Sequence, residues 1–127
     1  MRLMEKSTMK TVKVTTNNII SVIDIDFSDL HSVQNAIGGG YIETVHTQRM
    51  FDYFGRPIIL IVNEEGILKD LPVNAFGSDM YGYLMHGNPI CGDLILAVPD
   101  GEFLRGLEDA ETVMEKMIKD FKYLGGK

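Results

Sequence analysis

Residues 58–62 form the densest run of apolar side chains in the chain, with five aliphatic residues in succession. A run of this length is too short to cross a membrane and is typical of a strand that is covered on both faces. The segment Asn63-Glu64-Glu65-Gly66 follows, and it supplies residues that favour a type I turn closed by a left-handed glycine. The pattern predicts a β-hairpin in which residues 67–71 form the partner strand and Gly66 has a positive φ.

Other segments show the spacing of strands. Residues 11–16 alternate with a period of two, and Asn17-Asn18 is a turn signal because Asn accepts left-handed backbone angles. In the segment 41–45, side chains alternate between two faces, so Tyr41, Glu43 and Val45 share one of them. The predicted strands outside the hairpin are residues 11–16, 19–27, 41–45 and 90–98.

The clearest helical pattern covers residues 107–124, where apolar residues recur at intervals of three and four. Acidic residues in the first turn and lysines toward the end complement the helix dipole. The pattern predicts a C-terminal helix that docks on the sheet through Val113, Met117 and Phe121.

Two shorter helices are also predicted. Ser28 and Asp29 favour the start of a helix that Gly38-Gly39-Gly40 ends, because Gly fits the left-handed position after a helix. Asn74 is placed to cap a helix over residues 75–84, which Gly77 and Gly82 weaken.

These elements together indicate an α+β fold. We expect a single domain with a mainly antiparallel sheet of about five to six strands, a C-terminal helix packed on the sheet and one or two short helices. The domain is expected to span residues 10–124, after a flexible N-terminus at residues 1–9.

Residues 46–57 are expected to form a long connection that contains several aromatic residues. Such a segment either packs on the core through its own side chains or serves as a contact surface. Packing on the core is the favoured interpretation for Phe51 and Phe54, and contact with a ligand is favoured for Tyr53 and Arg56.

Composition and charge limit the classes of partner. The chain of 127 residues has a net charge of −6, which argues against nucleic acid and against an anionic membrane surface. No apolar stretch approaches the roughly 20 residues of a membrane span, and the charged first ten residues do not look like a secretory signal. The only cysteine, Cys91, lies in an apolar run, so we expect a buried thiol in a reducing cytoplasm.

Candidate chemistry is sparse. Asp24 and Asp26 share one strand face, but without a third ligand nearby an exposed face is the better interpretation. The triple glycine follows a helix instead of leading into one, which is the wrong order for a phosphate loop. The spacing of His31 and His46 does not match a zinc site. We therefore predict no catalytic residue, no metal and no cofactor.

Four motifs in succession carry a family resemblance. They are Ile37-Gly38-Gly39 before Tyr41-Ile42-Glu43, then Ile61-Val62-Asn63-Glu64-Glu65-Gly66, Leu71-Pro72-Val73-Asn74, and Ile90-Cys91-Gly92-Asp93-Leu94-Ile95-Leu96. This order resembles the family called domain of unknown function 3846, over roughly residues 12–103. The resemblance implies an accessory protein of gut bacteria, phages or other mobile elements, acting in the cytoplasm of a bacterial host. It supplies no catalytic residues.

Three functions remain open. The favoured one is a non-enzymatic binding protein that holds a host protein or a small nucleotide-like ligand and thereby interferes with host defence. A homo-oligomeric structural or regulatory protein, paired through a sheet edge or through Met114 and Met117, is the alternative. A hydrolase that uses Asp93, Glu43 or His46 ranks below both. The residues expected to contact a ligand are Tyr41, Glu43, Tyr53, Phe54, Arg56, Asn74 and Tyr81.

Overall fold

A single antiparallel sheet with the strand order β2-β1-β5-β4-β3 organises the molecule, and β6 pairs with the end of β5. The structure is a computed structural model that describes residues 8–82 and 87–125. Its strands are β1 (Thr8–Val14), β2 (Ile20–Asp26), β3 (Ile42–Val45), β4 (Ile59–Asn63), β5 (Leu94–Asp100) and β6 (Phe103–Arg105). Its helices are α1 (Leu30–Ala36), α2 (Gln48–Phe54), α3 (Ala75–Tyr81) and α5 (Ala110–Gly125). The predicted α+β fold is confirmed.

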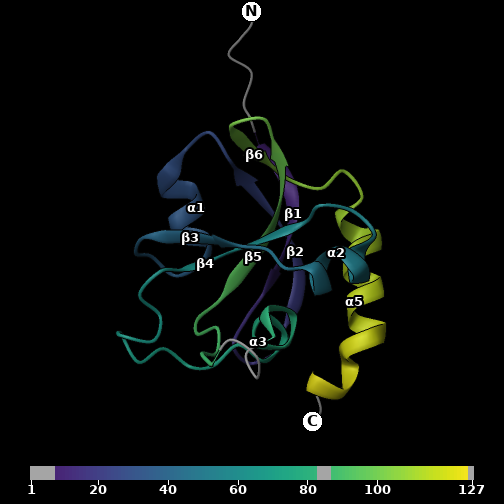
Figure 1. The fold of residues 1–127 in the computed structure, drawn as a ribbon. Helices are drawn as coiled ribbons and strands as arrows, with labels where there is room; N and C mark the ends of the chain where they lie inside the picture. Colours follow the sequence, from purple (N-terminus) through teal and green to yellow (C-terminus); the bar gives the residue numbers. More distant parts are fainter. Residues whose placement is uncertain (1–7, 83–86, 126–127) are drawn as a thin grey trace, which may run out of the picture.

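Helices cover both faces of the sheet (Figure 1). The larger core lies on the face covered by α2, α3 and α5, and it includes Leu60, Val62 and Leu96 from the central strands. The smaller core lies under α1, where Val33 and Ile37 pack against Ile59, Ile61 and Ile95. Because β4 has a covered face on either side, all five of its residues are buried, as expected for a continuous apolar strand.

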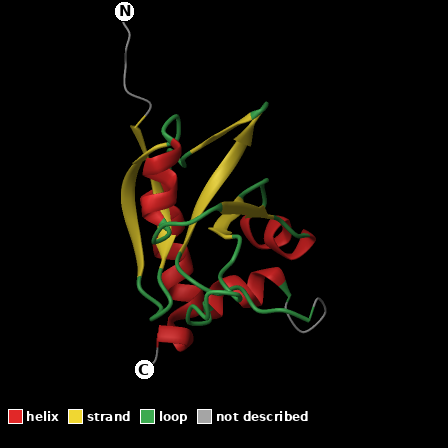
Figure 2. Ribbon diagram, turned by 90° about the vertical axis from the view of Figure 1, so that its left-hand side faces the viewer, coloured by secondary structure: helices red, strands yellow, loops and turns green. Residues whose placement is uncertain are grey.

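The β1–β2 pair joins the rest of the sheet along a short seam between β1 and β5. Strand β1 pairs with β2 over its whole length, but it pairs with β5 only at Lys13–Ile95 and Val14–Leu94. Beyond this seam the strands spread apart, as the yellow arrows in Figure 2 show. The backbone of Leu107 fills part of the opening, where its N–H donates to the carbonyl oxygen of Lys10 over 2.9 Å.

The C-terminal helix docks as predicted. Val113, Met117 and Phe121 are all buried in the larger core, and α5 lies against β1 and β2. The helix begins at Ala110 instead of residue 107, since the carbonyl of Asp109 accepts the first helical hydrogen bond, from the N–H of Val113.

The predicted hairpin is wrong. Strand β4 pairs with β3 on one side and with β5 on the other, so no edge of β4 is left for residues 67–71. Residues 64–70 instead form consecutive turns, in which the N–H of Lys69 donates to the carbonyl of Glu65. Gly66 is not among the residues with a positive φ. It is required for a different reason, because a Cβ there would lie 2.4 Å from the carbonyl oxygen of Cys91.

The predicted connection at residues 46–57 contains helix α2, so the described part of the chain has three short helices instead of one or two. Thr47 caps its start by accepting a hydrogen bond from the N–H of Met50 at Oγ1, and Gly55 ends it in a left-handed conformation with φ 73°. Both are standard cap residues. The prediction of a connection relied on the aromatic residues of the segment and did not use these two caps.

Two other predictions concern the ends of elements. Asp29, and not Ser28, caps α1, whereas the predicted cap at Asn74 is confirmed. Strand β1 begins at Thr8, and the rest of the predicted flexible N-terminus lies outside the described residues.

In the described part of the chain, no helix has the length and apolar character needed to cross a membrane.

Candidate binding site

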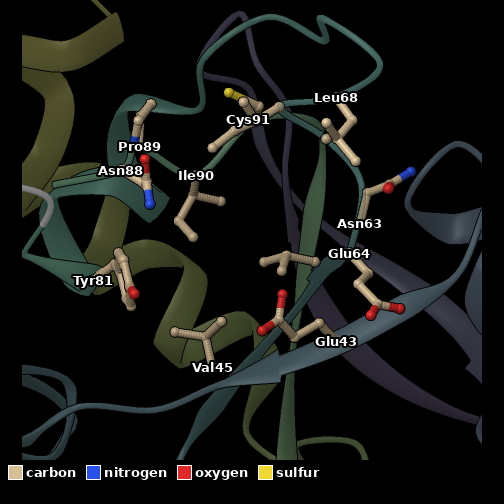
Figure 3. Close-up of a pocket in the computed structure, with 13 residues that line it drawn as sticks. Glu43, Val45, Asn63, Glu64, Leu68, Tyr81, Asn88, Pro89, Ile90 and Cys91 are labelled. Atoms are coloured by element: carbon tan, nitrogen blue, oxygen red, sulfur yellow. The ribbon is translucent and has the colours of Figure 1, made fainter. Parts of the chain in front are cut away.

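An open cavity of about 240 Å³ lies against β3 and the end of β4, beside α3 (Figure 3). Strand β3 contributes Glu43 and Val45, and α3 contributes its last residue, Tyr81. The opposite wall is the segment 88–91, which leads toward β5. The cavity therefore joins segments that are far apart in the sequence.

The cavity combines an apolar wall with one inward carboxylate. Val45, Val62 and Ile90 line it and are buried in the larger core. Glu43 stands opposite Val62 in the strand register, and Figure 3 shows its carboxylate directed into the cavity. Among the described residues, the Glu43 carboxylate has no hydrogen-bond or ion-pair partner. A charged group beside an apolar wall favours a ligand that carries the opposite charge on an apolar stem.

The outer rim is the turn segment 64–70. Its start is held by Asn63, whose Oδ1 accepts from the N–H of Glu65 over 2.7 Å and whose Nδ2 donates to the carbonyl of Gly39 over 3.0 Å. Its end is held by the N–H of Leu71, which donates to the carbonyl of Gly66. The rim is thus ordered by its own hydrogen bonds.

This ordered rim presents apolar side chains to solvent. Leu68 is 85% exposed and Ile67 is 51% exposed, and both line the cavity. Sequence reasoning missed them as contact residues because it placed them in a strand. One sequence signal does point to them: Ile67 and Leu68 are adjacent apolar residues directly after a turn motif, so they do not alternate with polar residues as in a half-buried strand.

Cys91 lies in the cavity wall, where its surroundings disfavour the reactive thiolate. The residue is buried, as predicted. Burial raises the pKa of its thiol, and the negative charge of Asp70 raises this pKa further. The thiol is therefore protonated at neutral pH, and the thiolate is the reactive form.

The structure brings together part of the predicted contact set. Glu43 and Tyr81 both line the cavity. Tyr41 lies beside its rim, since its carbonyl oxygen accepts from the N–H of Glu64 over 2.9 Å and its side chain is 66% exposed.

Tyr53 and Arg56 lie elsewhere and bind other parts of the same chain. The hydroxyl of Tyr53 donates to Asp120 over 2.8 Å, and its ring meets Phe54 and Phe121 edge to face. Burial and the bond to Asp120 raise the pKa of Tyr53 above its usual range. These contacts attach α2 to α5.

Arg56 holds the start of α5. Its guanidinium binds both carboxylate oxygens of Asp109, over 2.9 and 2.7 Å. Phe54 packs against the core, as favoured, but Phe51 is 49% exposed, so the interpretation that it packs under is wrong.

Asn74 is unavailable to a partner because it is fully buried. Its amide nitrogen donates to the carbonyls of Val14 and Gly92, over 3.1 and 3.0 Å. Its oxygen caps α3 by accepting from the N–H of Gly77 over 2.9 Å. Both amide N–H groups and the amide oxygen are thus used to join β1, α3 and the start of β5, and burial keeps the side chain from a partner.

The groups considered for metal binding or hydrolysis are dispersed. Asp24 pairs with Lys10 on an exposed face, over 3.2 Å. Asp93 accepts from the N–H of Thr16 and lies 3.7 Å from the ammonium of Lys13. Within residues 8–82 and 87–125, no three His, Cys, Asp or Glu side chains gather in the arrangement of a metal site.

The sequence model of one family, Domain of unknown function (DUF3846), matches residues 9–122. The chain belongs to the DUF3846 family. The match covers nearly the whole chain, so the cavity and all six strands, except the first residue of β1, lie within the DUF3846 domain. No curated protein and no solved structure was found to match the chain.

Proposed function

We propose that this DUF3846 protein is a non-catalytic binding protein whose ligand is a cationic segment of another protein. The observation that carries the proposal is the unpaired carboxylate of Glu43, which lies beside an apolar wall of an open cavity whose rim exposes Leu68. A Lys or Arg side chain suits this site, because its aliphatic stem can lie against Val45, Val62 and Ile90 while its charged end reaches the carboxylate.

The size of the cavity favours a side chain over a small molecule. Pockets for drug-sized ligands span roughly 300–1,000 Å³, whereas this cavity measures about 240 Å³ and is open to solvent. The exposed Leu68 and Ile67 beside it add apolar contact area, which a neighbouring part of a protein partner would cover.

A nucleotide-like ligand fits the site less well. The phosphate group would meet the carboxylate of Glu43, and the net charge of −6 repels anions in general. Arg56, the one basic residue in the predicted contact set, is bound to Asp109 through both of its terminal nitrogens.

The biological setting is the remaining part of the proposal. We place the partner among the proteins of a bacterial host in which a phage or mobile element carries this protein, and we place the encounter in the cytoplasm. This part rests on the family resemblance. An acidic protein that covers a basic surface would interfere with host defence by blocking that surface.

The test uses the labelled peptide acetyl-Thr-Val-Thr-Lys-Thr-Val-Thr-amide and fluorescence anisotropy. We expect saturable binding that weakens with added salt, and a peptide with Glu in place of Lys should bind about tenfold more weakly or not at all. Glu43→Gln should lose this preference for Lys. Glu102→Gln, which changes an exposed carboxylate far along the chain, is the control and should retain it.

The apolar rim is tested with a matched pair of variants. Leu68→Ser should weaken peptide binding, while Phe103→Ser, a change of a similarly exposed side chain on β6, should not. Both variants should unfold at the wild-type urea concentration, because exposed positions contribute little to stability. Equal binding of the Lys and Glu peptides, or equal effects of the two Ser variants, would refute the proposal.

A further inference from the structure

We infer that the cationic segment binds as an added antiparallel β-strand along the outer edge of β3, with its Lys or Arg opposite Glu43. This inference rests on the proposed function and specifies the form of the partner: an extended segment in place of a helix or a folded surface. Strand addition to an exposed sheet edge is a general mode of peptide recognition, in which main-chain bonds give affinity and side-chain pockets give specificity.

The hydrogen bonds of β3 determine which backbone groups face outward. The N–H of Glu64 donates to the carbonyl of Tyr41, so Tyr41 faces β4. Backbone groups alternate along an antiparallel strand, and the register continues as Glu43–Val62 and Val45–Leu60. The N–H and C=O groups of Ile42 and Thr44 therefore point away from the sheet.

Strand β3 is the last strand on its side of the sheet, and no described segment pairs with its outer edge. Its sequence, Ile-Glu-Thr-Val, contains no Lys or Pro. Its one charged residue, Glu43, opposes an acidic partner strand or a second copy, but not a basic strand. The opposite edge of the sheet, β2, is partly closed, because the N–H of Asp26 donates to the hydroxyl of Ser32 over 3.1 Å. The two edges of the sheet are thus not equivalent.

The β3 edge lies directly beside the cavity (Figure 3). In an added antiparallel strand, the residue opposite Glu43 would form a pair without main-chain bonds, where the Cα atoms are only about 4.5 Å apart and the side chains are close. Both side chains would point to the cavity face. A basic residue there would form a cross-strand ion pair with Glu43.

The exposed ring of Tyr41 fits the same arrangement. Tyr41, Glu43 and Val45 share one face of the strand, so a partner residue two positions from the basic residue would lie over Tyr41. Its exposure of 66% would then fall on binding. A partner strand with the pattern apolar–x–basic–x–apolar would place its basic residue opposite Glu43 and its apolar residues opposite Tyr41 and Val45.

A second copy of the chain is the rival occupant. Two β3 strands related by a twofold axis at Glu43 would place two carboxylates directly opposite each other, and like charges in that position are destabilising. Charge therefore favours a basic segment of a different protein.

The first test measures amide hydrogen exchange with and without the Lys peptide described above. We expect the amides of Ile42 and Thr44 to exchange at least about tenfold more slowly when the peptide is bound, because their N–H groups become donors. The outward amides of Val22 and Asp24 on β2 are the internal control and should not change. Unchanged exchange at Ile42 and Thr44 under saturating peptide would overturn the inference.

The second test substitutes Thr44. Thr44→Pro removes an outward N–H without breaking a bond to β4, and proline is tolerated at such edge positions. We expect it to weaken peptide binding at least about tenfold, while Thr44→Val, which keeps the backbone donor, binds as the wild type does. If Thr44→Pro does not fold, the exchange measurement on the wild type still decides.

The outcomes separate this inference from the proposed function. If Glu43→Gln weakens binding but Thr44→Pro does not, the cationic ligand stands and strand addition is wrong. If neither variant matters, both ideas fail. If light scattering shows a dimer that Thr44→Pro dissociates, the edge is occupied by a second copy and the inference is overturned.

Discussion

Gly66 is the residue at which the chain makes its closest backbone approach beside the cavity. A Cβ at this position would lie 2.4 Å from the carbonyl oxygen and 3.2 Å from the carbonyl carbon of Cys91. These are backbone atoms, which cannot rotate away as the end of a side chain can. The requirement for glycine is therefore one of space and not of φ.

Gly66→Ala should lower the free energy of unfolding by about 1–3 kcal/mol, the usual cost of inserting a methyl group into a packed position. Urea denaturation measures this change. Gly101→Ala is the control: its added Cβ meets nothing within 4 Å, and only its φ of 63° opposes the change, at about 1 kcal/mol. A smaller loss for Gly66→Ala than for Gly101→Ala would contradict the spatial argument.

Phe121 of α5 is a buried aromatic residue that contacts two other helices. Phe121 packs edge to face against Phe76, with ring centres 5.0 Å apart, and against Tyr53, with ring centres 5.3 Å apart. These rings join α5 to α2 and α3, so the helix is part of the core and not a peripheral addition.

Phe121→Ala should lower the free energy of unfolding by about 3–5 kcal/mol, because it removes a buried aromatic ring and leaves a cavity. Thermal or urea unfolding measures the effect. Ile118→Ala on the same helix is the matched control, since Ile118 is 43% exposed and its loss should cost well under half as much. An unchanged melting temperature for Phe121→Ala would mean that α5 docks differently.

The ion pair between Arg56 and Asp109 connects the segment before β4 to the start of α5, and it has a pH signature. The hydrogen bond from Arg56 lowers the pKa of the Asp109 carboxyl below its ordinary value of 3.8. A lowered carboxyl pKa contributes stability above the ordinary value, and this contribution is lost as the pH falls through the lower folded-state pKa. The pair therefore stabilises the protein at neutral pH and not in strong acid.

A double-mutant cycle with Arg56→Gln and Asp109→Asn should give a coupling of roughly 0.5–1 kcal/mol at pH 7, as for other half-exposed pairs. The coupling should decrease below pH 3.8 as Asp109 becomes protonated. Urea unfolding at several pH values measures it. A coupling that is independent of pH would show that the contribution is packing and not charge.

For the molecule as a whole, the parts that could be predicted from sequence are those with a local physical cause. The spacing of Val113, Met117 and Phe121 determines one helix face, and Asn74 is a cap wherever a helix follows it. The α+β class follows from the order of such elements. None of these predictions needs knowledge of distant neighbours.

The wrong predictions concern segments whose structure depends on contacts with residues far away in the sequence. Residues 67–71 have the composition of a strand, but β3 and β5 occupy both edges of β4 and leave these residues to form turns. The cavity could not be predicted for the same reason, because it joins β3, the 64–70 turns and the segment 88–91. Glu43 and Tyr81 are predicted from their residue types, whereas the only sequence signal for Leu68 is the missing polar alternation in Ile67-Leu68.

The narrow seam between β1 and β5 also governs the order of assembly during synthesis. The hydroxyl of Thr11 donates to the carbonyl of Leu96, a residue 85 positions later in the chain. A ribosome that adds about 5–20 residues per second needs roughly 4–17 s to synthesise that interval. The β1–β2 hairpin therefore emerges early and stays without its neighbour until β5 follows, so its apolar face is exposed to chaperones and to other nascent chains throughout that time.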